Sequence, residues 1–431
     1  MVKKLQTNIK LSRRLAGCTS KRLGELDFSE VDDGRQGDCK WSLPLILKHV
    51  LVGIMAGQKG LGEVEGGFAD MSTFMRNVLG FHRRIPDTTM RDALLKTGIE
   101  SLREVLHQSV LLALRRKALV VVGLPFHVAA LDGRKTSTRI GDGGQMAQTV
   151  SDFEGEVPKF SVATITACLT STPSKICLDA IPMPAKTNEK GFFKVALQSL
   201  LNTYGLLFKM VTYDAGANSK ANASFVHTQG LFYLFALKKD QPTLFVRAKQ
   251  LLANLGPELS TSMTDEILSG ERVVRRVWET TAMCGFRWSH LQTVLRVECQ
   301  TIDPKTGAVK ATYSRYFVSN APPGTLTSEQ WLLVVRSHWA VENNCHNTFD
   351  KIFQEDKRPF ILQPHGMLVV MILRRVAYNL LTLFRSVTQR SDQKKQMPWK
   401  SLMRSVSLML AKLEPHNLVP GSRLALKLGA G

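Results

Sequence analysis

The stretch Arg336-Ser-His-Trp-Ala-Val-Glu-Asn-Asn-Cys-His-Asn-Thr-Phe-Asp350 has the pattern of a helix with an apolar face and a polar face. Apolar residues at helical spacing predict packing against a core, and they are Val334, Val341, Cys345, Phe349 and Ile352. A polar stripe recurs every fourth residue and consists of His338, Glu342, His346 and Asp350. Two interpretations of the stripe are open. It is either a solvated face with one His–Glu pair or part of a site built around Glu342, and partners elsewhere in the chain would decide between them.

The charge of the chain points to a polyanionic partner. Its 431 residues include 57 Lys and Arg against 36 Asp and Glu, which gives a formal net charge of +21 at pH 7. Nucleic acid is the expected partner for such a protein. A membrane surface is the competing partner, but the sequence has no basic amphipathic helix with a strong apolar face. The longest apolar runs, such as 118–123 and 367–373, are too short to span a bilayer. We therefore expect no membrane association.

The cysteines and the N-terminus indicate the compartment. The chain has seven cysteines, an odd number, at irregular spacings and without a Cys-x-x-Cys pair. This argues against a disulfide framework or a zinc ribbon and fits a reducing compartment. The N-terminal residues lack the long apolar run of a signal peptide. The expected location is the cytoplasm, in association with the nucleoid.

The pattern along the chain predicts five regions. Residues 1–115 combine a basic arm with several short helices, and they form either a DNA-binding domain or a packing and dimerisation unit. Residues 118–257 alternate strands and helices, with strands expected at 118–123 and 126–131 and a hairpin over 160–183. This order predicts a mixed α/β layer in which a hairpin feeds a parallel section. Residues 258–325 read as a β-rich insertion, 326–390 as the last part of the core, and 391–431 as a basic C-terminal tail.

Two aspartates are predicted to lie where buried strands end, namely Asp132 and Asp214. In open α/β sheets ligands bind outside the carboxyl ends of strands, although Asp also closes strands for ordinary turn reasons. Grouped with Glu342, they would supply the oxygen ligands that Mg²⁺ or Mn²⁺ prefers. Two such ions support in-line attack on a phosphodiester. The sequence has no P-loop and no Gly-x-Ser-x-Gly elbow, and the spacing of His338, Glu342 and His346 is not the His-Glu-x-x-His of zinc enzymes.

Five blocks of sequence carry a family resemblance. They are Ala130-Leu-Asp-Gly-Arg-Lys, Lys186-Thr-Asn-Glu, Val211-Thr-Tyr-Asp-Ala, Tyr233-Leu-Phe-Ala-Leu-Lys-Lys-Asp-Gln-Pro, and the 336–350 stretch continued by Phe353-Gln-Glu-Asp. In this order they resemble the DDE transposases of bacterial insertion sequences, specifically the ISAs-type branch of the IS-four superfamily. The likeness covers about residues 40–380. Cys345 and Asn347 depart from it, because relatives usually have Leu and Trp there.

The resemblance implies a fold and a set of site residues. The fold would be α/β, with a ribonuclease-H-like catalytic core, a β-strand insertion before the last catalytic helix and an N-terminal helical domain. The catalytic and metal-holding acids would be Asp132, Asp214 and Glu342, with Mg²⁺ or Mn²⁺ as cofactor. His338, Trp339 and Asn343 would support Glu342. The basic residues expected to contact DNA are Arg134, Lys135, Lys238 and Arg336.

The resulting hypothesis is a DNA transposase that cuts element ends and joins the 3′-hydroxyl to target DNA. Its partners would be double-stranded DNA, as terminal inverted repeats and target, and further copies of the chain in a homodimer or larger oligomer. Two alternatives remain open at this point. One is a DNA-binding protein derived from a transposase and no longer catalytic, and the other is a nuclease without strand transfer.

Overall fold

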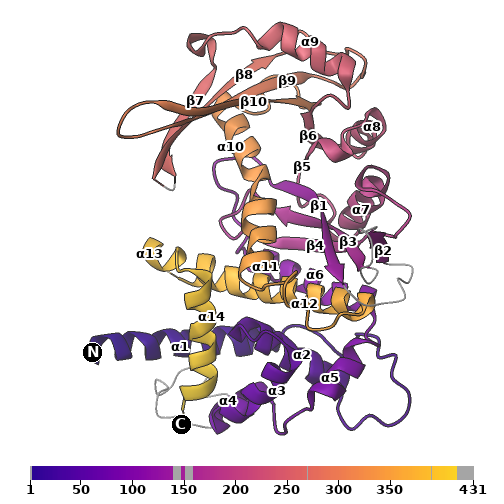
Figure 1. Cartoon of the computed structure of the whole chain (residues 1–431), viewed down its shortest axis with the longest axis vertical. Helices are drawn as coiled ribbons and strands as arrows, with labels where there is room; N and C mark the ends of the chain where they lie inside the picture. The colour runs from indigo at the N-terminus through magenta and orange to yellow at the C-terminus, as the bar shows by residue number, and fades with distance from the viewer. Residues whose placement is uncertain (1, 139–146, 151–158, 269, 390, 415–431) are drawn as a thin grey trace.

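The computed structural model describes residues 2–138, 147–150, 159–268, 270–389 and 391–414. The described part is mixed α/β, as the sequence predicts. Figure 1 shows three levels along the long axis: a helical base, a central sheet with helices beside it, and a second group of strands at the far end.

The helical base contains the N-terminal third of the chain. Its helices are α1 (Val2–Leu23), α2 (Leu43–Ala56), α3 (Leu61–Asp70), α4 (Thr73–Leu79), α5 (Asp87–Leu94) and α6 (Ile99–Arg115). Gly57 ends α2 and Gly80 ends α4, both in the left-handed conformation that glycine adopts without strain. The apolar faces of these helices share one buried cluster with α12 (Pro364–Leu383) and α14 (Trp399–Lys412). The base is therefore built from both ends of the chain (Figure 1).

This arrangement corrects two predicted regions. Residues 1–115 are predicted to be a separate helical domain, but their core is completed by α12 and α14. The segment 391–431 is predicted to be a basic tail, but it contains the short helix α13 (Asp392–Lys395) and α14, which packs on α1 and α2. Apolar residues at helical spacing in α14, such as Leu402 and Val406, are fully buried there. Residues 415–431 lie outside the described part of the chain.

The apolar helical segment around α12 is longer than the run 367–373 considered in the sequence. By length and composition alone, the helical segment 364–388, which includes the π-helical turn η4 (Phe384–Thr388), could cross a membrane. The same segment is fully buried in this fold, where α2 and α6 cover it. Core helices of globular proteins pass the same test, so this helix by itself does not indicate a membrane span.

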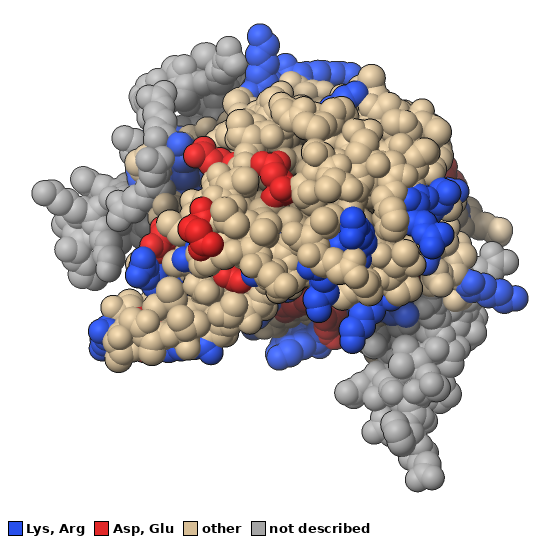
Figure 2. Space-filling model, turned by 90° about the horizontal axis from the view of Figure 1, so that it is seen from above, with Lys and Arg blue, Asp and Glu red and all other residues tan. Residues whose placement is uncertain are grey.

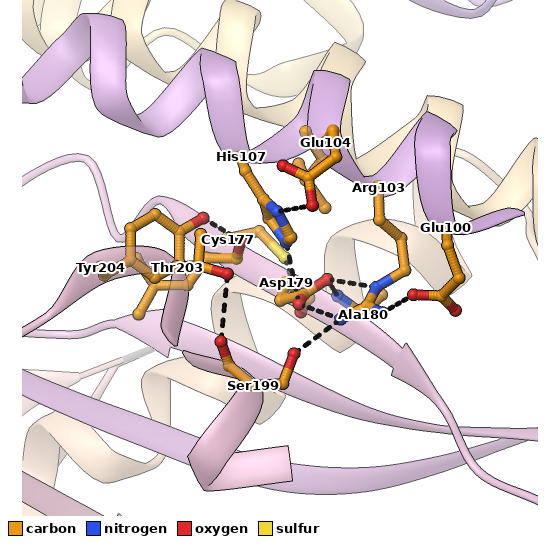
Figure 3. Close-up of polar contacts among 12 residues, drawn as sticks. Glu100, Arg103, Glu104, His107, Cys177, Asp179, Ala180, Ser199, Thr203 and Tyr204 are labelled. Atoms are coloured by element: carbon orange, nitrogen blue, oxygen red, sulfur yellow. Dashed lines mark hydrogen bonds and ion pairs between the residues drawn. The ribbon is translucent and has the colours of Figure 1, made fainter. Parts of the chain in front are cut away.

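A buried ion-pair cluster ties the helical base to the central sheet (Figure 3). Asp179, on β4 (Cys177–Pro182), is fully buried and accepts a hydrogen bond from Nε of Arg103 on α6 at 3.1 Å. His107, one turn further along α6, places Nε2 3.0 Å from the same carboxylate. Ser199 of α7 (Glu189–Tyr204) accepts a hydrogen bond from Arg103 at 3.2 Å. We call Asp179, Arg103, His107 and Ser199 the Asp179 cluster.

The strands of the described residues form one ten-stranded sheet in the order β2-β3-β1-β5-β6-β10-β9-β8-β7, with β4 also paired to β3. The core strands are β1 (Val128–Thr138), β2 (Ala147–Val150), β3 (Lys159–Leu169), β4, β5 (Met210–Tyr213) and β6 (Phe232–Leu237). Strand β3 is antiparallel to β1 and β4, which confirms the predicted hairpin, and β1, β5 and β6 are parallel. The connecting helices are α7, α8 (Lys220–Thr228) and α9 (Pro242–Leu252).

One predicted strand is wrong and another is longer than expected. Residues 118–123 are not a strand, although they are apolar enough to suggest one. Val120 and Val122 are in fact exposed, so this segment gains no burial from its apolar side chains. Strand β1 begins at Val128 and continues to Thr138, so Asp132 lies within the strand rather than at its end.

The predicted β-rich insertion over 258–325 extends the central sheet. Its strands are β7 (Ser262–Leu268), β8 (Glu271–Thr280), β9 (Thr293–Ile302) and β10 (Val309–Ser319), preceded by the short turn η2 (Pro257–Leu259). Strand β10 pairs with β6 from Tyr316–Leu237 to Ser319–Leu234, which joins the insertion to the core by hydrogen bonds. Helix α10 (Ser328–His338) then packs its apolar side, including Val334, on β8–β10. The insertion thus holds the helix that leads to Glu342.

Candidate active site

Strand pairing places the first two predicted acids side by side. On the parallel strands β1 and β5, Ala130 is the partner of Thr212. Continuing this register by two residues brings Asp132 next to Asp214, and neighbouring strands are about 4.8 Å apart. Asp214 follows β5 directly and caps the short turn η1 (Ala215–Ala217), where its Oδ1 accepts a hydrogen bond from the Gly216 N–H at 2.7 Å. The sheet therefore brings together two residues that are far apart in the sequence.

The helix quoted at the outset is interrupted at the point where Glu342 stands. Helix α10 begins with a capping box formed by Thr327 and Gln330 and ends at His338. The π-helical turn η3 (Val341–His346) follows and leads into α11 (Asn347–Lys351). Single π-turns inside helices are rare and occur often at functional sites. Glu342 lies in this turn.

The polar stripe of this helix faces β1 and β5. His338 is 5% exposed, and its Nδ1 is 2.9 Å from Oγ1 of Thr212 on β5. The Nδ1 of His346 lies 3.2 Å from Oδ2 of Asp132 on β1. Asp350 forms an ion pair with Arg134, also on β1. The stripe is therefore packed against the strands that carry the two aspartates, and the interpretation as an ordinary solvated face is wrong.

Glu342 shares its surroundings with the two aspartates. Partial burial raises the pKa of Glu342, and the negative charges of Asp132 and Asp214 raise it further, against the opposing charges of Arg315 and Lys238. A carboxylate whose pKa is raised by other carboxylates is destabilised by its neighbours in the charged form. The three predicted acids thus lie within electrostatic reach of one another.

The predicted supporting residues lie in three different settings. Burial lowers the pKa of His338, despite the opposing charges of Asp132 and Asp214, so the imidazole is neutral near pH 7. The ring of Trp339 lies under the guanidinium of Arg315 at 4.0 Å from ring centroid to Cζ. Asn343 is exposed, and its side chain borders a cleft described below. His338 is placed to hold Glu342's helix against β5.

Arg134 does not fit its predicted role as a DNA contact. Its guanidinium is buried and forms ion pairs with Asp350, with Glu355 at 3.1 Å and with Asp356 at 3.1 Å. Glu355 is itself fully buried and also pairs with Arg375 of α12. Three carboxylates thus hold Arg134, and it joins β1 to the segment after α11. Its position after Asp132 in the sequence gave no sign of this burial.

The other three predicted DNA contacts are exposed. Lys135 extends from β1, and its charge opposes the raised pKa that burial and the two aspartates give the nearby Glu189 carboxyl. Lys238 directly follows β6, and its charge acts in the same sense on Glu342. Arg336 lies on α10 and forms an exposed ion pair with Glu266 of β7. These positions leave all three side chains accessible to a polyanion.

A cleft of about 700 Å³ opens between α10 and the extended sheet and reaches Glu342. Its charged lining consists of Lys175, Arg275, Arg315 and Arg336 against the single carboxylate of Glu342. Tyr313 and Trp339 add aromatic surface, and Arg315 lies against both rings. In the view onto the sheet end of the molecule, Lys and Arg surround a largely uncharged centre, and Asp and Glu gather toward one side (Figure 2).

Two residues of this region are absent from the predicted site. Arg315 lies on β10, and its charge opposes the raised pKa of Glu342. Glu189 begins α7, and its carboxyl approaches Gly133 and Gly216, the neighbours of the two aspartates. The block Lys186-Thr-Asn-Glu carries part of the family resemblance, so it was a usable signal for Glu189. No local pattern on β10 distinguishes Arg315 from the other basic residues of the insertion.

The donor atoms of the candidate site are carboxylate oxygens, which suit a divalent cation. Glu342, Asp132 and Asp214 are oxygen donors whose mutual repulsion a cation would relieve. Within the described residues, however, no three His, Cys, Asp or Glu side chains are grouped closely enough to hold a metal ion as they stand. Binding would thus require side-chain rotations of these acids.

Comparison with known proteins gives distant relatives. No family model matches the chain. It is 28% identical over 224 residues to the H repeat-associated putative transposase YhhI of Escherichia coli, covering 49% of this chain and 58% of the relative. The same identity and coverage apply to the putative protein YbfL of the same organism. The match spans little more than half the length of either relative.

Among solved structures, the chain is similar to a chain in the cryo-EM structure of the piggyBac transposase synaptic complex with hairpin DNA. The TM-score is 0.42 and the sequence identity 10%, over 98% of this chain and 84% of that one. A TM-score this low does not establish a common fold.

Proposed function

We propose that the chain is a DNA transposase. It would cut the ends of a mobile element by metal-dependent phosphodiester hydrolysis and join the 3′-hydroxyl to target DNA. The observation that carries the proposal is the convergence of three acids. The register of the parallel strands β1 and β5, continued by two residues, brings Asp132 next to Asp214, and Glu342, in the π-turn after α10, lies within electrostatic reach of both. The similarity to a relative named as a transposase supports the same function.

The strand order is compatible with the finer assignment. An antiparallel segment, β4-β3-β1, continues into the parallel strands β5 and β6, as expected of a ribonuclease-H-like core. The order of the sequence blocks supports placement among the DDE transposases, in the ISAs-type branch of the IS-four superfamily. A cytoplasmic, nucleoid-associated location and an oligomer assembled on DNA belong to the same proposal.

The residues of the site would divide the work as follows. Asp132, Asp214 and Glu342 would hold Mg²⁺ or Mn²⁺, which supplies charge stabilisation at the attacked phosphate when bound. His338 would fix the helix by its contact with Thr212, and His346 would orient the Asp132 carboxylate. The cleft lined by Arg315, Arg275 and Lys175 would hold the phosphates of the strand that reaches Glu342.

Cleavage of DNA by the purified protein tests the proposal. The substrate is a duplex that carries the inverted repeats found beside the gene, incubated with Mg²⁺ or Mn²⁺. We expect Asp132→Asn, Asp214→Asn and Glu342→Gln to abolish cleavage, while binding in a gel-shift assay survives. Glu329→Gln is the matched control, because Glu329 is an exposed acid in the first turn of α10 and lies outside the site.

Each outcome of this experiment separates the candidate functions. Joined products distinguish a transposase from a nuclease that only cuts. Binding without cleavage by the unaltered protein indicates a DNA-binding derivative that has lost its activity. Retained cleavage in all three variants would show that the acids do not carry the reaction.

A further inference from the structure

Glu189 stands at the start of a helix, where side chains usually point to solvent, yet it is only partly exposed. It is the first residue of α7, after Asn188, whose side chain accepts a hydrogen bond from the Gly191 N–H at 2.9 Å. Its carboxyl group turns back toward the sheet. A Cβ built on Gly133 would overlap this carboxyl group, and one built on Gly216 would lie 3.2 Å from Glu189 Oε2. The carboxyl of Glu189 therefore lies between Gly133, the residue after Asp132, and Gly216, two residues after Asp214.

Gly133 and Gly216 make this approach possible. Gly133 lies on β1 next to Asp132, where a strand normally favours a residue with a side chain. Glycine in a strand interior often marks a place where another group comes close to the backbone. Here that group is the Glu189 carboxyl. The close approach of the Glu189 carboxyl explains why residue 133 is a glycine: any side chain there would overlap the carboxyl group.

The charges of Asp132 and Asp214 act on Glu189 as they act on Glu342. Burial raises the pKa of Glu189, and the charges of Asp132 and Asp214 raise it further, with only Lys135 acting against them. Glu189 thus adds a fourth carboxylate to a group that already repels itself. A merely structural acid at a helix N-terminus would gain from the helix dipole without needing such neighbours.

Tyr213 provides an independent observation at this site. Its side chain is 1% exposed, yet its hydroxyl has no hydrogen-bond partner within the described part of the chain. Burial raises its pKa, and so do the charges of Glu189, Asp132 and Asp214, in that order. The charges of these three acids therefore act on the buried hydroxyl as well. A buried donor without an acceptor is costly, so this hydroxyl calls for an oxygen acceptor beside it.

We propose that Glu189 is a fourth acidic residue of the metal site, and that Gly133 is glycine in order to admit its carboxylate. The proposal rests on the proposed function, since it concerns the same divalent cation. Glu189 would share the cation with Asp132 and Asp214. This requires rotation of the acids, because no three stand at ligand distance in the described residues.

Manganese binding by the purified chain tests this role without any measurement of activity. Mn²⁺ is titrated into the unaltered protein and into Glu189→Gln, with free Mn²⁺ followed by electron paramagnetic resonance, with and without duplex DNA. We expect the Glu189→Gln variant to bind Mn²⁺ at least tenfold more weakly. Glu329→Gln, which removes the same charge from another helix start, leaves the affinity unchanged.

Gly133→Ala separates the position of the carboxylate from its charge. This variant keeps Glu189 but fills the space that its carboxyl occupies, so we expect the same loss of Mn²⁺ affinity as in Glu189→Gln. Thermal unfolding identifies a variant that fails to fold, and the Glu189→Gln result stands without it. An affinity of Glu189→Gln within twofold of the unaltered chain, or no Mn²⁺ binding by the unaltered chain, overturns the proposal. Mn²⁺ binding without DNA cleavage would instead count against the transposase function alone.

Discussion

The carboxylates of the Asp179 cluster and of the candidate site differ in burial and in charge: Asp179 is fully buried, whereas Asp132, Asp214, Glu189 and Glu342 are partly buried. Burial alone would raise the pKa of Asp179, but hydrogen bonds and charges from His107 and Arg103 outweigh it and lower that pKa. Burial raises the pKa of Glu342 and of Glu189, and the neighbouring aspartates raise both further. The Asp179 cluster carries its own counter-charges, whereas the candidate site gathers like charges.

This difference is the one expected between a structural cluster and the proposed active site. A buried, hydrogen-bonded ion pair holds two elements in register, and here it fixes α6 to β4 (Figure 3). A set of carboxylates without enough internal cations is destabilising, and it persists where an external cation or a reaction needs it. The Asp179 cluster would not be a good place to search for activity, although it contains a His, an Asp and a Ser.

The largest expected effect comes from breaking the paired cluster. Asp179→Asn leaves Arg103 charged and buried without its carboxylate, and removal of one partner of a buried pair costs about 3–5 kcal/mol of unfolding free energy. Asp214→Asn removes one of several like charges and keeps a side chain that can cap η1, so its unfolding free energy should change by less than about 1 kcal/mol. Urea denaturation at pH 7 measures both. Equal losses in the two variants would contradict the distinction between the clusters.

A smaller effect should appear in the pH dependence of stability. Burial lowers the pKa of His107, but the hydrogen bond and charge of Asp179 and the charge of Glu104 outweigh burial and the charge of Arg103, so the pKa is raised. A raised pKa means stabilisation that is complete below the unfolded value of about 6.5 and is lost as pH rises through the folded value. The stability difference between the unaltered protein and His107→Gln should therefore shrink as pH rises above about 6.5.

Denaturation of both proteins in parallel from acidic to alkaline pH measures this difference directly. The Thr203→Ala variant serves as a control, because it removes a hydrogen bond to the Ser199 carbonyl near the same cluster without a titrating group. A difference between His107→Gln and the unaltered protein that stays constant across the range would show that His107 does not titrate with a raised pKa.

The smallest effect on stability is expected at the surface of the cleft. Arg336 pairs with Glu266 in an exposed position, and such pairs contribute about 0–1 kcal/mol. Arg336→Ala should therefore leave stability nearly unchanged and weaken DNA binding, with the slope of log affinity against log salt reduced by about one. Fluorescence anisotropy over a salt series measures the slope. Arg247→Ala, an exposed change on α9, provides the comparison, and an equal effect of both variants would argue against a specific role of the cleft.

The sequence predicts those parts of the fold that depend on local pattern. The hairpin of β3 and β4 and the β-rich insertion follow from the alternation of apolar and polar residues. The boundary at 115 could not be predicted, because the core of the N-terminal helices is completed by segments more than 250 residues away. The strand predicted at 118–123 is wrong for a related reason. Whether an apolar run is buried depends on which segments pack against it and not on its composition alone.

The candidate site divides in the same way. Asp132, Asp214 and Glu342 could be proposed from sequence blocks, and the register of β1 and β5 is consistent with them. Arg134 shows the limit of such blocks, since its sequence position beside Asp132 does not reveal the three carboxylates that hold it. Glu189 could be noticed as part of a block, but its approach to Gly133 is a property of the folded sheet.

The burial of α12 between the N-terminal helices and the sheet has a consequence for the order of events during synthesis. Helices α2 and α6 leave the ribosome roughly 250–300 residues before α12, and at 5–20 residues per second this interval is on the order of tens of seconds. Throughout that time the parts of α2 and α6 that α12 covers have no permanent partner. During synthesis, the nascent chain must therefore avoid association of these exposed apolar surfaces with other chains until its C-terminal third has been synthesised.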